Sequence, residues 1–336
     1  MKLWHKPYLL AILLGSLISA AGVLSLGIGT AEIQTQEVID ALLGKPVPRT
    51  TSAIVLDIRL PRLILAILIG AALAVAGTAM QGFFQNPMAD PHIVGVSSGA
   101  ALGATCGIIF RVDFWFAGMS SIPILAFLGA LAVTFLVYGL SLRGGRIPVV
   151  LLLLIGVAIG ALAAALTSFL MILADEDTLQ ILHWILGSLS SRRWEHVQMI
   201  LPYVILGVSV LWLYARDLNV LLLGEETAQH TGIDVERVKR VVLSASALLA
   251  AAAVSVSGII GFVGLIVPHL MRLLTGPDHR RLIPISALAG ALLMVLADIV
   301  ARTLIAPSET PIGIITSVLG CPFFLFLIAR RKDLAL

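Results

Sequence analysis

The stretch Asp217–Arg240, DLNVLLLGEETAQHTGIDVERVKR, is a long polar interruption in an otherwise apolar half of the chain. Its acidic residues are followed over a short span by the basic residues Arg237, Lys239 and Arg240, and a run of leucines gives it an apolar side. Gly232 is suited to end a helix and Asp234 to cap the next one, so we expect a first helical piece over Asn219–His230 and a second after the turn. Mixed charge beside an apolar side is typical of a surface that docks onto a soluble protein. The alternative is a solvated connector between two membrane helices.

Composition places the rest of the chain in a membrane. Apolar residues make up 59% and charged residues 12% of it, whereas soluble domains carry about 25% charged residues. The net charge of +3 is small and its basic residues are scattered, so a nucleic-acid partner is not expected. Cys106 and Cys321 both lie in apolar segments, which supports neither a disulfide framework nor a thiolate metal site.

Ten apolar segments have about the length that crosses a bilayer. They run over residues 8–28, 61–83, 93–110, 122–142, 148–173, 195–215, 238–257, 259–274, 283–305 and 311–329. We therefore predict an all-α, polytopic membrane protein with one transmembrane domain over 1–336 and both termini on one side. Most basic residues then lie on that side, which makes it cytoplasmic, together with loop 217–240, whereas segment 30–60 is external. The segment 259–274 is doubtful, because it rises only ~24 Å against a ~30 Å core and contains Pro268.

A short basic motif, Arg59-Leu60-Pro61-Arg62, comes directly before the second segment. Its proline suits the first turn of a helix, where cations oppose the helix dipole, so we do not expect the two arginines to serve local helix stability. Together with Arg302, they are predicted to form an external patch that receives carboxylates of a partner. The alternatives are headgroup anchoring for the motif and an internal ion pair between Arg302 and Asp298.

Glycines recur every fourth residue in the third segment, at Gly95, Gly99, Gly103 and Gly107. Such a stripe is predicted to pack closely against another membrane helix. For His92, beside a proline-rich turn, a metal or proton site is one interpretation, and for His269, in the doubtful segment, a proton relay is one. A lone histidine in such a position is more often hydrogen-bonded structure, and no metal site is expected.

Five motifs, in order along the chain, resemble the FecCD family. They are RLPR at 59–62, QNPMADPHIVGVSSGA at 85–100, GEETAQHTGI at 224–233, GFVGLIVPHLMRLLTGPDHR at 261–280, and ADIVAR at 297–302 followed by PIGIITSVLG at 311–320. The family comprises permease subunits of ATP-binding-cassette importers for iron-siderophores, haem and cobalamin. The resemblance implies a homodimer in the inner membrane, with ten helices per subunit, two ATPase subunits and an external solute-binding protein.

The resemblance also implies roles for particular residues. Contact with the ATPase is expected in the opening stretch, at Gly224, Glu225, Glu226, Ala228 and Gly232. The binding protein is expected to dock on Arg59, Arg62 and Arg302. The cytoplasmic start of the fifth segment would narrow the exit of the translocation path, and here it reads Ile147, Pro148, Val149 and Val150. Some relatives have small polar residues there, so this chain departs from the pattern at its gate.

Nothing in the sequence predicts an enzyme. It contains no phosphate-binding loop, nucleophile elbow or metal-ligand spacing, so the chain is expected to bind no cofactor, and the partner ATPase would use ATP and Mg. An ion-gradient-driven secondary transporter is the alternative, and a membrane-embedded enzyme is a third. Both would need polar or ionisable groups within the membrane, and the apolar segments have almost none. Siderophore, haem and cobalamin all stay open as cargo.

Overall fold

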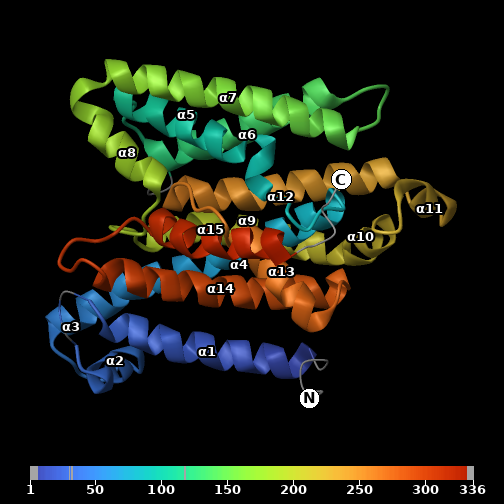
Figure 1. Ribbon diagram of the computed structural model, residues 1–336. Helices are drawn as coiled ribbons and strands as arrows, with labels where there is room; N and C mark the ends of the chain where they lie inside the picture. Colours follow the sequence, from blue (N-terminus) through green and yellow to red (C-terminus); the bar gives the residue numbers. More distant parts are fainter. Residues whose placement is uncertain (1–6, 30, 32, 117–118, 331–336) are drawn as a thin grey trace.

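The computed structural model describes residues 7–29, 31, 33–116 and 119–330, and they are almost entirely helical (Figure 1). A short antiparallel hairpin of β1 (Trp115–Phe116) and β2 (Met119–Ser120) joins two of the helices. The α-helices are α1 (Pro7–Gly27), α2 (Thr35–Leu42), α3 (Arg49–Ala53), α4 (Leu60–Phe83), α5 (Val96–Ile109), α6 (Ser121–Ser141), α7 (Val149–Leu173), α8 (Thr178–Leu186), α9 (Trp194–Leu213), α10 (Ala215–Leu221), α11 (Glu225–His230), α12 (Val235–Ser257), α13 (Val263–Thr275), α14 (His279–Thr303) and α15 (Ile312–Arg330).

The long apolar helices confirm the predicted fold class. Within the described residues, seven helices are long and apolar enough to cross a membrane, and three shorter apolar helices, α5, α13 and α15, accompany them. Each of the ten expected segments corresponds to one of these helices. The chain is therefore an all-α integral membrane protein.

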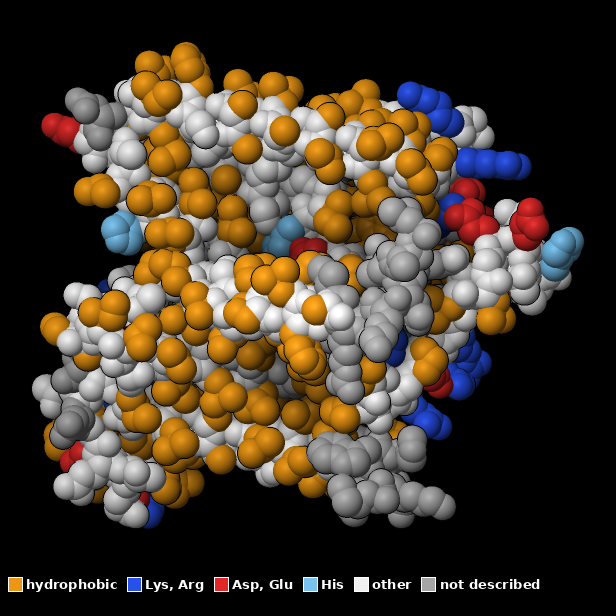
Figure 2. All heavy atoms as spheres, viewed as in Figure 1, with side chains coloured by type: hydrophobic (Ala, Val, Ile, Leu, Met, Phe, Trp, Pro, Cys, Tyr) orange, Lys and Arg blue, Asp and Glu red, His pale blue; other side chains and the backbone are white. Residues whose placement is uncertain are grey.

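Helix α4 lies at the centre of the bundle and packs against α9, α12, α13 and α14. In the most apolar windows of α4 and α12, 78% of the residues are buried, against 17% in α7. Helix α7 lies at one edge of the bundle beside α5 and α6 (Figure 1). Its outer face is therefore covered with exposed apolar side chains, as Figure 2 shows, and such a face must meet lipid or another subunit.

The long helices run between two ends of the molecule (Figure 1). One end carries α10 and α11, and the opposite end carries α2, α3 and α8. Charged side chains gather at these ends, whereas hydrophobic ones cover the surface between them (Figure 2). This distribution is what a bilayer between the two ends requires.

The glycine stripe lies against α6. A Cβ atom on Gly99 would collide with the backbone oxygen of Gly129, and one on Gly103 with that of Leu125. On Gly107 the nearest atom would be a side-chain carbon of Leu125, at 2.8 Å. Gly95 starts the helix with a φ of 87°, in the left-handed region that favours glycine.

Two of the shorter helices differ from their expected bounds. Helix α5 begins at Val96 instead of residue 93, because a 3-10 turn over Pro91–Val94 and the left-handed Gly95 precede it. Helix α13 begins only at Val263 and has 13 residues, which rise about 20 Å. The doubtful eighth segment is thus shorter than a full bilayer span.

The Arg59–Arg62 motif does not start a helix, contrary to our expectation. A continuous helical run extends over Arg49–Phe83, and residues Ile54–Arg59 in it are π-helical. The N–H of Leu60 donates to the carbonyl of Val55, five residues back. Pro61 has no N–H and crowds the preceding turn, so a wider turn here accommodates it. The helix-dipole argument therefore does not apply to these arginines.

The opening stretch also differs in one respect. The single helix expected over Asn219–His230 is broken at Leu222–Gly224, where Gly224 has a φ of 106°. Gly232 follows α11 with a φ of 85°, as a helix-ending glycine does. The predicted cap is confirmed, because the Asp234 carboxylate accepts a hydrogen bond from the Arg237 N–H at 3.0 Å.

Candidate functional site

Helix α11 has a small apolar core of its own. Ala228 is fully buried and packs with Leu221 of α10 and Val235 of α12. The apolar side of the stretch therefore faces its neighbouring helices in part, although Leu223 is 69% exposed. A contribution of Ala228 to partner contact stays a prediction, and it would act through the placement of α11.

The outward face of α11 is polar. Glu226, His230 and Gly232 are exposed, and Glu225 is partly exposed. Figure 2 shows acidic side chains and a histidine at this end of the molecule, with basic side chains beside them. This surface has the mixed charge of a site that fixes the register of a protein partner.

The buried ammonium group of Lys239 joins α11 to α12 and to the start of α7. Lys239 of α12 has a side chain only 3% exposed, and its Nζ lies 2.7 Å from Glu225 Oε2. The same Nζ lies 3.4 Å from Glu236 Oε1 and donates to the carbonyl of Ile147 at 3.3 Å. Glu236 Oε2 in turn accepts the Ile147 N–H at 2.9 Å. We call these four residues the Lys239 cluster.

The Lys239 cluster joins the predicted ATPase contact to the predicted gate. Ile147 comes just before α7 and is 1% exposed, whereas Val150 in the first turn is 70% exposed. Pro148 is also exposed and Val149 is half-buried. The gate role of these four residues stays a prediction. The cluster nevertheless supplies a direct connection between α11 and the start of α7.

The three predicted docking arginines lie in the interior near the opposite end. Arg62 holds Asp298 and Glu309, with nitrogen–oxygen distances of 2.9 and 2.7 Å. Arg302 Nε lies 3.1 Å from Asp298 Oδ2, so the alternative of an internal ion pair is confirmed. Arg302 also donates to Ser25 Oγ at 2.7 Å.

Arg59 serves the end of α1. Its Nη1 donates to the carbonyls of Leu26 and Gly27 at 2.6 and 2.8 Å. A cation that binds the last carbonyls of a helix is favoured by the helix dipole. Arg59, Arg62 and Arg302 are each less than 9% exposed. They therefore form no exposed basic patch in this conformation, and their docking role stays a prediction.

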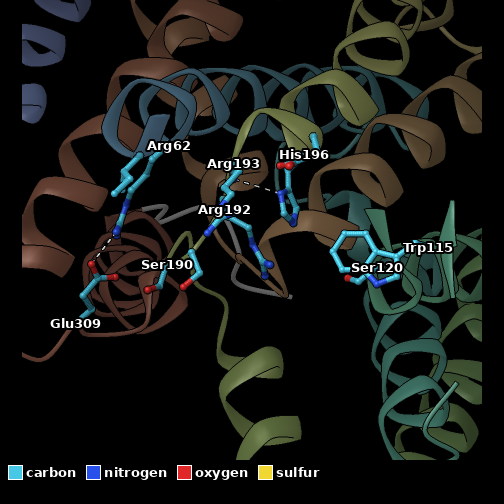
Figure 3. Close-up of a pocket in the computed structure, with 11 residues that line it drawn as sticks. Arg62, Trp115, Ser120, Ser190, Arg192, Arg193, His196 and Glu309 are labelled. Carbon is cyan, nitrogen blue, oxygen red and sulfur yellow. Dashed lines mark hydrogen bonds and ion pairs between the residues drawn. The ribbon is translucent and has the colours of Figure 1, made fainter. Parts of the chain in front are cut away.

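A pocket of about 610 Å³ lies beside this arginine network (Figure 3). Its walls come from the start of α4, the β1–β2 hairpin, the link between α8 and α9, and the loop before α15. Arg62 and Glu309 pair on one wall, and the Arg193 N–H donates to His196 Nδ1 at 3.3 Å. Figure 3 shows the Arg192 side chain extending into the space between Ser190 and His196.

Arg192 is the unsatisfied group of this pocket. Its Nε exposes less than 1 Å² and has no hydrogen-bond partner in the described part of the chain. Burial lowers the pKa of Arg192 to about 10, so the side chain is still cationic at neutral pH. The sequence offered no signal for this, since Arg192 stands in a polar link where charges are normally solvated.

The buried position of Lys239 could have been foreseen. Val235, Val242 and Leu243 lie three or four residues from it and are all buried, so they mark the inner face of α12. Lys239 lies on that same face, three residues after Glu236. A lysine on an apolar face beside a carboxylate predicts a buried ion pair.

His92 has structural hydrogen bonds. Its Nδ1 lies 2.6 Å from Ser97 Oγ, and its Nε2 lies 3.1 Å from the carbonyl of Ile260. Within the residues that the structure describes, no group of three or more histidine, cysteine or acidic side chains is placed to hold a metal ion. The bonds to Ser97 and Ile260 join α5 to the segment before α13.

The known proteins that this chain resembles are transport permeases. The model of the FecCD transport family matches residues 17–330. The chain is 48% identical to the cobalamin import system permease protein BtuC of Halobacterium salinarum over 290 residues, which cover 86% of this chain and 77% of that protein. It is 46% identical to the hemin transport system permease protein HmuU of Yersinia pestis over 286 residues, 83% and 84% of the two chains.

A solved structure has the same fold. An inward-facing conformation of a metal-chelate type ABC transporter superposes with a TM-score of 0.85 and 34% identity, over 97% of this chain and 100% of that chain. The sequence motifs, the helical bundle and these relatives agree, and the chain therefore belongs to the FecCD transport family of importer permeases.

Proposed function

We propose that this chain is the membrane subunit of an importer that takes a metal chelate or cobalamin from an external solute-binding protein and releases it in the cytoplasm. The permeases named above, for cobalamin and hemin, support this class of cargo. Two subunits would form the path, and a separate ATPase would supply the energy. The exposed apolar face of α7 supports the dimer, because part of it can pack against a second copy.

The observation that carries the proposal is the Lys239 cluster. In our proposal the end with α10 and α11 faces the cytoplasm, and ATP-driven closure of the ATPase moves α11. Glu225 belongs to α11, and Lys239 ties it to the backbone of Ile147. A displacement of α11 must therefore either carry the start of α7 with it or separate Glu225 from the buried Lys239 ammonium, which is unfavourable because that charge stays in the interior. The path would open alternately to the two sides in this way.

The test is uptake in proteoliposomes that contain the permease, its ATPase and the binding protein. We expect uptake only with the ATPase and ATP, and we expect it to survive an uncoupler of ion gradients. Uptake by the permease alone, driven by an ion gradient and abolished by the uncoupler, would instead establish a secondary transporter.

A further inference from the structure

Arg192 stands at the junction of two pockets. The first, of about 610 Å³, and a second, of about 430 Å³, are both lined by Ser120, Ser190, Ser191 and Arg192. The second pocket extends to Trp184 of α8 and to the buried Ser257 at the end of α12. Pockets of this size are typical of small-molecule sites. Serine hydroxyls on their shared wall can donate hydrogen bonds to an anion.

Within the described residues, none of the charged groups around Arg192 forms an ion pair with it. Arg62 is paired with Asp298 and Glu309. Glu195 also lines a separate pocket beside α6 and α9, and no ion pair joins it to Arg192 in the described residues. The remaining neighbours, Arg193 and His196, carry no negative charge. A buried donor on a charged group is costly when it has no partner, so a free Arg192 Nε indicates a site that another molecule completes.

We propose that Arg192 binds a carboxylate carried by the imported chelate, in the external pocket through which the chelate enters the permease. This inference rests on the proposed function. A guanidinium group offers a planar pair of N–H donors that matches the two oxygens of a carboxylate. The neighbouring serines supply further donors, and the indole of Trp115 forms an apolar wall for the body of the ligand.

The depth of Arg192 favours the chelate over a side chain of the binding protein. Arg193, its neighbour, is exposed at the surface, whereas Arg192 is partly buried and its Nε is almost fully covered. An acidic side chain that approaches with a docking protein would meet Arg193 first. A small molecule can enter the pocket and reach Arg192. Chelates with free carboxylates, such as ferric dicitrate or hemin, should therefore bind better than a neutral ferric trihydroxamate.

The test measures equilibrium binding to the permease–ATPase complex in lipid nanodiscs, without ATP and without the binding protein. The probes are ferric dicitrate, hemin and a neutral ferric trihydroxamate. The variants are Arg192→Gln, Arg192→Lys and, as the matched control for loss of one positive charge, Arg193→Gln. Hydrogen bonds to a charged group are strong enough that we expect Arg192→Gln to weaken binding of a carboxylate chelate about tenfold or more.

Arg192→Lys keeps the charge but loses the planar fork, so it should restore only part of the affinity. Arg193→Gln should change the affinity less than about twofold, because its charge is solvated. Binding of the trihydroxamate should be the same in all four proteins. Without ligand, Arg192→Gln should melt no lower than the wild type, because it removes a buried N–H donor, Nε, that has no partner. A residue that only stabilises the fold would give a lower melting temperature.

Several results would overturn the inference. The first is equal affinity of the wild type for carboxylate and neutral chelates. The second is an affinity for carboxylate chelates that Arg192→Gln does not change. The third is an equal loss of this affinity in Arg192→Gln and Arg193→Gln. Slower association of the binding protein with unchanged chelate binding would assign the carboxylate to that protein and would also overturn it. The assay uses no ATP, so its failure is distinguishable from a failure of the proposed function, which would appear as absent ATP-dependent uptake.

Discussion

Arg62 of α4 and Arg302 of α14 hold the two oxygens of one carboxylate, that of Asp298, at 2.9 and 3.1 Å. Asp298 is 1% exposed, so both ion pairs lie away from water. The two arginines come from distant parts of the sequence, and one acidic residue fixes both side chains. The central pair of helices, α4 and α14, is thus joined by charge as well as by apolar packing.

Asp298→Asn should therefore destabilise the protein strongly. It leaves two buried guanidinium groups short of a counter-charge, a change that typically costs about 3–5 kcal/mol for a broken buried pair. The measurement is thermal unfolding in detergent. Asp40→Asn is the matched control, since Asp40 pairs with exposed Lys45 and should change the melting temperature little. Equal melting temperatures for wild type and Asp298→Asn would contradict the prediction.

A test of the predicted docking role of the buried arginines must distinguish slower association of the binding protein from loss of folded permease. Reversal of Arg59 or Arg302 to Glu should slow association of the binding protein in a salt-dependent manner if either residue receives a partner carboxylate. Arg302→Glu also places a second carboxylate beside Asp298, so association must be measured on protein shown to be folded. An unchanged association rate in folded variants would make these arginines purely structural.

The glycine stripe gives a prediction with an internal control. Gly99→Leu and Gly103→Leu should each lower the melting temperature, because their side chains would collide with the backbone of α6. Gly139 of α6 has no atom within 4 Å of a hypothetical Cβ, so Gly139→Leu should be tolerated. Equal stability of all three variants would show that α5 and α6 do not pack as described.

The outer and inner faces of α11 should give different phenotypes. Glu226 is exposed and forms no ion pair within the part of the chain that the structure describes. Glu226→Lys should therefore release the ATPase in copurification while leaving the permease folded. Normal copurification and normal uptake would exclude Glu226 from the contact.

Lys239→Met should uncouple transport without loss of the ATPase. It removes the group that links Glu225 to Ile147, so less of the movement of α11 should reach α7. We expect uptake per ATP hydrolysed to fall several-fold while ATP hydrolysis continues. Lys239→Met combined with Glu236→Gln controls for the carboxylate left behind in the interior. An unchanged ratio of uptake to hydrolysis in both variants would contradict the proposed connection.

Acid should weaken the start of α14. Hydrogen bonds from Arg280 and Asn219 lower the pKa of Asp278 to about 2. A depressed pKa contributes stability that is present above the unfolded value near 4 and is lost as the pH falls towards 2. Thermal unfolding at pH 7 and pH 3 should therefore show a larger drop for the wild type than for Asp278→Asn. Equal drops would contradict the assignment.

The bundle could be predicted from the sequence because each helix must be apolar over a bilayer length, a local property. Local chemistry also predicted the Asp234 cap and the glycine stripe. The π-helical turn before Leu60 was not predicted. From the sequence alone, a proline in the first turn of a helix cannot be distinguished from a proline inside a longer helix. The long-range contacts were missed as well. Ile147 and Lys239 are 92 positions apart, and neither local sequence contains a pattern that indicates their contact.

The bonds at the end of α1 have a consequence for how the protein is made. Arg302 donates to the carbonyl of Ile28, 274 positions earlier, and to Ser25 one turn before it. Helix α1 is synthesised before α14, so its last carbonyls lack these partners until α14 has been synthesised and inserted. Translation that stops before α14 should leave this helix end open, and quality-control proteases would then meet an incompletely closed bundle.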